Sequence, residues 1–429
     1  MTWSFETDPD FQQELDWIER FVEEKVAPLD FVLENPFDVT NPANRKLVPP
    51  LQHEVRRRGL WACHLGPELG GKGYGQVKLA LMNEIIGAAK FGPIVFGNQA
   101  PDSGNAEILA RFGTEDQKAR YLQPLLNGDI VSCFSMTEPQ GGADPLLIDT
   151  TAVREGDEWV LNGEKWFSTN ASTAEFFLVM AKSEFDAKPH DSISCLIVPA
   201  STPGLTVMRD VGYGNAHPTH GYVRYENVRV PADHMLGSPG QGFRVAQTRL
   251  GGGRIHHAMR TIAKARKALD YMKRRAVSRT TKGESLSRKQ LVQQKIAQSW
   301  VQLEQFRLLV LQTAWKIDKE GDYYKVRKDI AAVKFAMPKV MHDIAGNALH
   351  IHGSLGLSTE MPFAQWVIES YYLALADGPT EVHEITVARE LLKGVEPDEV
   401  QFPDYHLLRR REAAMAQYGE ALAEVKGEA

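Results

Sequence analysis

The spacing of apolar residues changes twice along this 429-residue chain, and these changes limit its possible folds more than any other feature. Near the N-terminus, Phe11, Leu15, Ile18 and Val22 recur every three or four residues, which indicates one buried face of a helix. From about residue 131 to 237, short apolar runs alternate with Gly, Pro and Asn, which is typical of strands and turns. Beyond residue 242 the helical spacing returns in longer stripes. The sequence therefore predicts a helical part, a strand-rich part and a second helical part.

Local signals predict individual elements within these parts. Thr114-Glu115-Asp116-Gln117 is typical of a capping box that starts a helix. Glu155-Gly156-Asp157 and Asn162-Gly163 indicate turns between strands, and the short strands favour a barrel or a sandwich. In the last part, long helices with narrow apolar stripes are typical of an antiparallel helix bundle, in which one helix face remains available for contact with another subunit. The stripes in the last part predict four helices, over residues 258–276, 292–317, 330–344 with a kink at Pro338, and 382–392.

Composition excludes several classes of protein. With 43% hydrophobic and 24% charged residues the chain has ordinary globular proportions, and its net charge of −6 argues against a nucleic-acid binder that relies on a general basic field. No apolar run approaches the ~20 residues needed to cross a bilayer. Cys63, Cys133 and Cys195 are isolated from one another, which indicates core residues in a reducing compartment. Because no Lys or Arg precedes Arg20, we expect no export signal and a cytoplasmic location.

Two histidine pairs invite a metal interpretation. His256-His257 and the pair His350 and His352 are close in sequence, but neither has the spacing of a zinc helix or a carboxylate-rich partner segment. We therefore expect no metal site.

Two segments of the strand-rich part could contact a ligand. Residues 137–144, Thr-Glu-Pro-Gln-Gly-Gly-Ala-Asp, offer a hydroxyl, main-chain N–H groups and glycines that allow close approach, although as a bare pattern they could simply form a turn. Residues 165–170, Lys-Trp-Phe-Ser-Thr-Asn, could present an indole and hydroxyls to an aromatic cofactor, although this segment taken alone favours Trp166 as a core residue of a strand.

Asp377 is the carboxylate with the most informative surroundings. It lies in Ala376-Asp377-Gly378-Pro379, between an apolar helix end and the next amphipathic helix. A carboxylate there could cap the following helix. A carboxylate in apolar surroundings at a turn is also what a general base requires. Spacing alone leaves both interpretations open.

Taken together, these motifs resemble the acyl-CoA dehydrogenase family over essentially the whole chain. The matching segments, in order, are Pro67–Gly71, Phe112–Leu122, Thr137–Pro139, Asn162–Trp166, Gly242-Phe243, Arg254 and Asp377-Gly378. The resemblance implies an α+β fold: a helical N-terminal domain (residues 1–130), a middle β-barrel domain (131–238) and a C-terminal four-helix bundle (239–429). It also implies FAD as cofactor, an acyl-CoA substrate, an electron-transfer flavoprotein as acceptor, and a homodimer or homotetramer.

The resemblance further implies roles for individual residues. Asp377 would remove the α-proton of the thioester while the β-hydrogen leaves as hydride to flavin N5, giving the trans-2-enoyl-CoA, and Arg254 would be an active-site arginine. We expect burial and substrate contact to raise the pKa of Asp377 toward neutrality. Arg279, Thr281 and Gln290 would reach the FAD pyrophosphate of the neighbouring subunit. The full cofactor-binding set implied is Phe134, Met136, Thr137, Gly142, Trp166, Ser168, Arg279, Thr281, Gln290 and Gly353.

The chain departs from the family pattern at several positions. Asp377 replaces the usual Glu, as in one branch of the family. Ala143 stands where a phosphate-binding Ser is usual, Lys282 where a Phe is usual, and His350 and Ser354 fall in the Gly-rich cofactor stretch. Two alternatives stay open: a flavin oxidase or monooxygenase of the same superfamily, and a catalytically silent partner subunit.

Overall fold

The computed structural model describes residues 6–69, 71–214 and 216–427. The chain divides into two units, Met1–Glu384 and Ile385–Ala429, and each is described by itself. All three cysteines are free and buried, as the sequence predicts. No helix within the described ranges is long and apolar enough to cross a membrane.

The first part of the chain is helical, as predicted. Phe11, Leu15 and Ile18 are buried along α1, and the side chain of Asp8 caps this helix. The predicted capping box is also confirmed: Gln117 N donates to Thr114 Oγ1 over 3.2 Å, and Thr114 N donates to Gln117 Oε1 over 3.1 Å. The helices are α1 Pro9–Phe21, α2 Pro42–Arg57, α3 Gly75–Ile86, α4 Gly92–Val95, α5 Asp102–Phe112, α6 Glu115–Gln117 and α7 Gln123–Asn127, with π-helical turns at Val22–Val26 and Lys118–Leu122.

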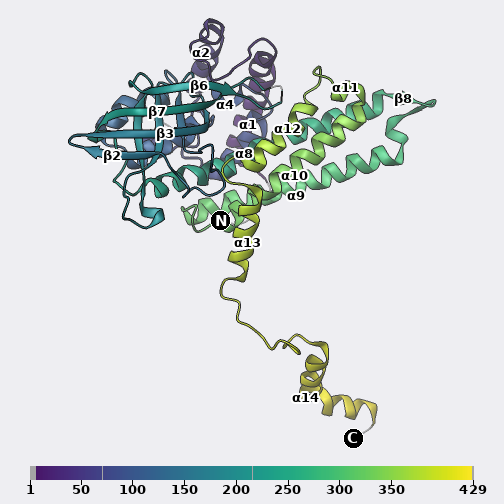
Figure 1. Cartoon of the computed structure of the whole chain (residues 1–429). Helices are drawn as coiled ribbons and strands as arrows, with labels where there is room; N and C mark the ends of the chain where they lie inside the picture. The colour runs from purple at the N-terminus through teal and green to yellow at the C-terminus, as the bar shows by residue number, and fades with distance from the viewer. Residues whose placement is uncertain (1–5, 70, 215, 428–429) are drawn as a thin grey trace. The chain divides into compact units, whose positions relative to one another are not determined.

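The middle part forms one seven-stranded sheet (Figure 1). Its path is β1-β4-β2-β3-β7-β6, with β5 paired to β4. The strands are β1 Ser132–Ser135, β2 Thr151–Glu155, β3 Glu158–Thr169, β4 Phe176–Lys182, β5 Ile193–Pro199, β6 Leu205–Val211 and β7 His220–Pro231. β1 and β4 are parallel, whereas β2–β3, β3–β7, β6–β7 and β4–β5 are antiparallel. Nearly every residue of β4 and β5 is buried, so these two strands form the centre of this part.

One predicted turn of this sheet is confirmed and the other is wrong. Gly156, at φ +60°, lies in the connection between β2 and β3. Asn162-Gly163 instead lies inside β3, where the register with β7 shifts. A Cβ on Gly163 would come within 2.5 Å of Thr150 Oγ1, so the glycine permits close packing at a bulge.

The last part is a helical bundle, but its fourth helix is not the one that the sequence predicted. α10 packs against α8, α9 and α12, so α12 is the fourth helix of the bundle. The stripe predicted over residues 382–392 forms a helix, α13, but Val382, Ile385 and Leu392 are 42%, 50% and 68% exposed. The elements are α8 Gly242–Ser278, a hairpin of β8 Thr280–Thr281 and β9 Glu284–Ser285, α9 Gln290–Glu320, α10 Arg327–His352, α11 Ser354–Leu357, α12 Phe363–Leu375 and α13 Thr380–Leu392.

The second unit contains the end of α13 and α14, Leu407–Lys426. No described residue of α14 is buried.

Candidate active site

Asp377 lies in a left-handed turn between α12 and α13. Its φ is +56° and that of the following Gly378 is +103°. Asp is one of the few residues with a side chain that adopt this conformation readily, and Gly meets no steric barrier there. The carbonyl oxygen of Asp377 accepts hydrogen bonds from Arg254 Nε at 2.9 Å and from His383 Nε2 at 3.2 Å. The main chain at Asp377 is therefore fixed from α8 and from α13.

Lys334 of α10 holds both ends of the same turn. Its Nζ donates to the carbonyl oxygen of Leu373 at 2.5 Å and of Gly378 at 3.3 Å, and the residue is only 1% exposed. Burial lowers the pKa of Lys334 to about 8. Sequence reasoning missed this residue, although a lysine beside the apolar stripe of Ile330 and Val333 was a visible signal.

The carboxylate of Asp377 faces α8. Its side chain is 15% exposed, and Oδ2 lies 3.8 Å from Nε2 of His257, whose side chain is 18% exposed. A Cβ on Gly253, one turn earlier in α8, would lie 2.9 Å from Oδ2. The carboxylate thus occupies space that only a glycine in α8 leaves open. Sequence reasoning considered His257 only as a metal ligand.

The charges around Asp377 favour its ionised form. Burial raises its pKa, but the surrounding groups, with the positive charges of Arg249, Arg254 and Lys334 among them, outweigh burial and hold the pKa of this carboxyl below its usual value. Burial also lowers the pKa of His257 to about 4, so the imidazole is neutral at neutral pH and the two arginines and Lys334 supply the positive charge. The buried cations around the group therefore outweigh the rise in pKa that burial alone would cause.

The two segments predicted to line a flavin lie side by side. Trp166 N donates to the carbonyl oxygen of Thr137 over 2.8 Å, and the hydroxyls of Ser135 and Ser168 share a hydrogen bond of 3.0 Å. Trp166 is half-buried, while Gly142 is exposed. The arrangement therefore offers an indole, a hydroxyl-bearing turn and an accessible glycine on one surface. We call this surface the sheet wall.

A buried ion pair supports the sheet wall. Lys165 Nζ lies 2.7 Å from Glu138 Oε1, with side-chain exposures of 0% and 2%, and also donates to the carbonyl oxygen of Met136 at 2.9 Å. Glu138 accepts further hydrogen bonds from the main-chain N–H groups of Asp149 and Thr150, at 2.7 and 3.0 Å. Burial lowers the pKa of Lys165 to about 8, whereas that of Glu138 is held below its usual value because the contacts with Lys165 and nearby donors outweigh burial. Both residues fell inside segments that the sequence singled out, but their pairing across the turn was not predicted.

Arg249 joins the sheet wall to the surroundings of Asp377. Its guanidinium lies 4.1 Å from the ring centroid of Phe134, and its Nε donates to Asn105 Oδ1 at 2.8 Å. The same guanidinium helps to lower the pKa of Asp377. The structure thus brings Phe134 and Asp377 to one region around α8.

A stack of aromatic rings makes a second connection. Phe167 stacks on His220 with centroids 5.0 Å apart, His220 lies 5.7 Å from Tyr213, and Tyr213 stacks on Tyr372 of α12 at 4.9 Å with an angle of 10°. Tyr372 lies about one turn before Asp377, so the stack extends from β3 to the helix that precedes the carboxylate.

The remaining predicted cofactor residues lie elsewhere. Arg279 and Thr281 are exposed in and beside the β8–β9 hairpin, which follows the C-terminal end of α8, and Gln290 begins α9. From His257 to Arg279, α8 extends roughly 30 Å at about 1.5 Å per residue. Figure 1 shows β8 at the far tip of the long helices, away from the sheet. Within one chain these residues are therefore not brought to Asp377.

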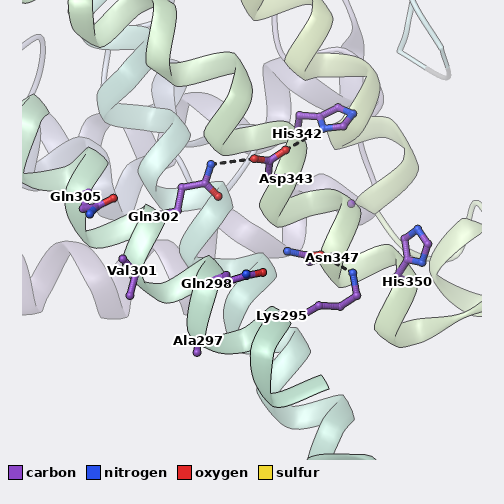
Figure 2. Close-up of a pocket in the computed structure, with 11 residues that line it drawn as sticks. Lys295, Ala297, Gln298, Val301, Gln302, Gln305, His342, Asp343, Asn347 and His350 are labelled. Atoms are coloured by element: carbon purple, nitrogen blue, oxygen red, sulfur yellow. Dashed lines mark hydrogen bonds and ion pairs between the residues drawn. The ribbon is translucent and has the colours of Figure 1, made fainter. Parts of the chain in front are cut away.

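A groove of about 690 Å³, lined mostly by residues with polar side chains, lies between α9 and α10 (Figure 2). Gln302 Nε2 donates to Asp343 Oδ2 over 3.0 Å, and Lys295 Nζ donates to Asn347 Oδ1 over 2.9 Å. His350, one of the departures from the family pattern, lines this groove one turn before Gly353. Gly353 has φ +66° and ends α10.

Comparison with known proteins covers all three parts of the chain. Residues 8–129, 133–228 and 240–392 match the families described as acyl-CoA dehydrogenase N-terminal, middle and C-terminal domain. The matched region ends before α14.

Individual relatives agree with this assignment. "Probable acyl-CoA dehydrogenase FadE2" of Mycobacterium tuberculosis is 39% identical over 360 residues, which are 82% of this chain and 87% of the relative. "Acyl-CoA dehydrogenase family member 10" of Mus musculus is 39% identical over 388 residues, 87% of this chain but only 36% of that longer protein. The solved "Structure of a putative acyl-CoA dehydrogenase from Mycobacterium abscessus" is 37% identical with a TM-score of 0.84, and the match covers 91% of this chain and 100% of that one. The chain belongs to the acyl-CoA dehydrogenase family.

Proposed function

We propose that this protein is a flavin-dependent dehydrogenase that converts an acyl-CoA thioester into the trans-2-enoyl-CoA. The observation that carries the proposal is the buried carboxylate of Asp377, fixed in a left-handed turn among cationic side chains and in the same region as the sheet wall. A base and a cofactor surface on either side of a substrate are what removal of two adjacent hydrogens requires.

The residues of the sheet wall fit the isoalloxazine ring of FAD. The indole of Trp166 offers an apolar surface, and the turn at Thr137 and Gly142 offers a hydroxyl and main chain that a flat polar ring can approach. Phe134, Met136 and Ser168 complete this set, and the Lys165–Glu138 pair holds the turn in place. When bound, FAD supplies an acceptor at flavin N5 for the β-hydrogen, which leaves as hydride.

The chain's own residues would carry out the proton transfer. Asp377 takes the α-proton, because its carboxylate is ionised at neutral pH and its turn is fixed by Arg254, His383 and Lys334. The main-chain N–H of Asp377 would donate to the thioester carbonyl oxygen, where negative charge develops. A base with a pKa below its usual value is a weak proton acceptor, so substrate binding must displace water and raise that pKa for the step to be fast.

The proposal includes a second subunit and an acceptor. Arg279, Thr281 and Gln290, with Gly353 and the nearby groove, lie far along the bundle from Asp377, which supports contact with the FAD of a neighbouring chain. An arginine fork suits phosphate oxygens. We propose a homodimer or homotetramer, which this arrangement supports, and an electron-transfer flavoprotein as the acceptor of the electrons.

The test is flavin bleaching by a panel of acyl-CoA thioesters under anaerobic conditions. Wild-type protein with FAD should bleach with at least one of them, whereas Asp377→Asn should keep its FAD and not bleach, because an amide cannot accept the proton. Asp270→Asn is the matched control, since Asp270 is an exposed carboxylate on α8. Bleaching of Asp377→Asn at the wild-type rate would contradict the assignment of the base. Rapid oxygen consumption with peroxide release would instead favour an oxidase.

A further inference from the structure

His257 is the neighbour of the base to which the proposed reaction gives no role. Nε2 of His257 lies 3.8 Å from Oδ2 of Asp377, within a region where both side chains are more than four-fifths buried. This distance is longer than a hydrogen bond. Hydrogen bonds between catalytic groups are often long without substrate and shorten when substrate binds.

Three other neighbours of Asp377 are engaged with the main chain, and Arg249 donates to the side chain of Asn105. Arg254 and His383 donate to the carbonyl oxygen of Asp377, and Lys334 donates to the carbonyl oxygens of its turn. The charged and titratable groups that act on the pair are Arg249, Arg254 and Arg260 from α8, Lys334 from α10, Tyr372 from α12 and His383 from α13. His257 is the group whose ring faces the carboxylate oxygen itself.

Two further contacts fix the geometry of this pair. The glycine at Gly253 lets Oδ2 approach α8, since a Cβ there would lie 2.9 Å from it. The ring of Tyr372 packs edge-on against the His257 ring, with centroids 6.4 Å apart and an angle of 74°. The imidazole and the carboxylate are therefore held facing each other by α8 and α12.

We propose that His257 is a positioning residue for the base: its neutral imidazole donates from Nε2–H to Oδ2 of Asp377 when substrate binds, which leaves the other carboxylate oxygen directed at the α-carbon. This inference rests on the proposed function. A donor to the carboxylate also stabilises its ionised form, so the hydrogen bond limits the rise in pKa that substrate binding causes and lowers the pH at which the base becomes active. Burial lowers the pKa of His257 to about 4, which keeps the imidazole neutral in the pH range of the reaction.

The experiment compares His257→Leu, His257→Gln and wild type, each with FAD and the best acyl-CoA of the panel. At saturating substrate, the rate of flavin reduction in His257→Leu should be lower than that of wild type by on the order of 10-fold or more. The acid limb of its pH–rate profile should move to higher pH. His257→Gln keeps an N–H donor and should restore most of the rate and the original acid limb. KM and FAD content should stay near the wild-type values in both variants.

His256→Leu is the matched control. His256 precedes His257 in α8, but its Nε2 donates to Gln76 Oε1 over 3.1 Å, away from Asp377. The acid limb of the pH–rate profile of His256→Leu should coincide with that of wild type. An unmoved acid limb in His257→Leu, or equal impairment of the Leu and Gln variants, would overturn the role of His257 while leaving the proposed function intact. Failure of wild type to bleach with any acyl-CoA would overturn the proposed function, and this inference with it.

Discussion

Arg254 contacts Asp377 through the main chain: its Nε donates to the carbonyl oxygen of Asp377 over 2.9 Å. The guanidinium therefore does two things at once. It holds the left-handed turn in place, and its charge contributes to the low pKa of the carboxyl group. An active-site arginine in this position acts on the base without needing to contact the substrate.

Arg254→Lys should slow flavin reduction by about 100-fold, because a lysine cannot reproduce the Nε contact and a shift of about 1 Å in the base has an effect of that order. FAD content should not change. The measurement is the anaerobic bleaching rate, and Arg229→Lys, at an exposed ion pair on β7, is the control. Equal rates for Arg254→Lys and wild type would contradict the positioning role.

Gly253→Ala should impair catalysis while leaving the helix intact. Alanine has the higher helix propensity, but its Cβ would meet Oδ2 of Asp377 at 2.9 Å and displace the carboxylate. We expect a fall in rate of at least 10-fold. Gly419→Ala, in α14, where the nearest atom to a Cβ is the end of a methionine at 3.7 Å, should leave the rate unchanged. A fully active Gly253→Ala protein would show that the carboxylate works from another position.

Lys165→Met should destabilise the protein by roughly 3–5 kcal/mol, because it leaves Glu138 buried without its partner. The double variant Lys165→Met with Glu138→Gln should recover part of this loss, since no buried charge remains. The free energy of unfolding from urea titration checks both. If the single variant is as stable as wild type, the ion pair does not support the sheet wall.

The low pKa of Lys334, about 8, predicts a specific dependence of stability on pH. Above pH 8 the folded protein releases the proton of Lys334, whereas the unfolded chain retains it up to about the ordinary value of 10.5. The unfolded state then binds more protons, so raising the pH stabilises the folded state by up to about 1.4 kcal/mol per pH unit in this window. The measurement is the difference in the free energy of unfolding between wild type and Lys334→Met. This difference should grow in favour of wild type between pH 8 and 10 and stay constant below pH 7. A difference that stays flat up to pH 10 would contradict the lowered pKa.

Arg279→Ala should weaken FAD binding without unfolding the subunit, since Arg279 is exposed at the end of α8 and its proposed ligand belongs to a neighbouring chain. FAD release on dilution, followed by flavin fluorescence, measures this effect. Lys273→Ala, which removes another exposed cation of α8, is the control. Unchanged FAD affinity in Arg279→Ala would remove the support for cofactor binding across subunits.

Local patterns in the sequence predicted the elements that neighbouring residues determine. The stripe of Phe11, Leu15 and Ile18, the capping box at Thr114 and the turn at Gly156 depend on residues within one or two turns of each other, and all three are confirmed. The turn predicted at Asn162-Gly163 was wrong because glycine occurs both in turns and at bulges where chains pack closely. Only the position of Thr150 in the folded chain distinguishes these two uses. α12 was expected only as an apolar helix end before Asp377 and not as a bundle helix, because several of its apolar side chains, among them Leu375, remain exposed and no narrow stripe marks it.

For the site, the sequence by itself determined which residue types are present: a carboxylate before a glycine at the end of a helix, a Trp followed by hydroxyls, and consecutive glycines in α8. Only the tertiary structure decided which of them meet. His256 and His257 are adjacent, yet about 100° of helix rotation separates them, so that one contacts Gln76 and the other faces Asp377. Spacing along a chain reports only local geometry, whereas the contact between Arg254 and Asp377 joins segments 123 positions apart. Such a contact depends on how α8, α10 and α12 pack, and that packing is a property of the whole core.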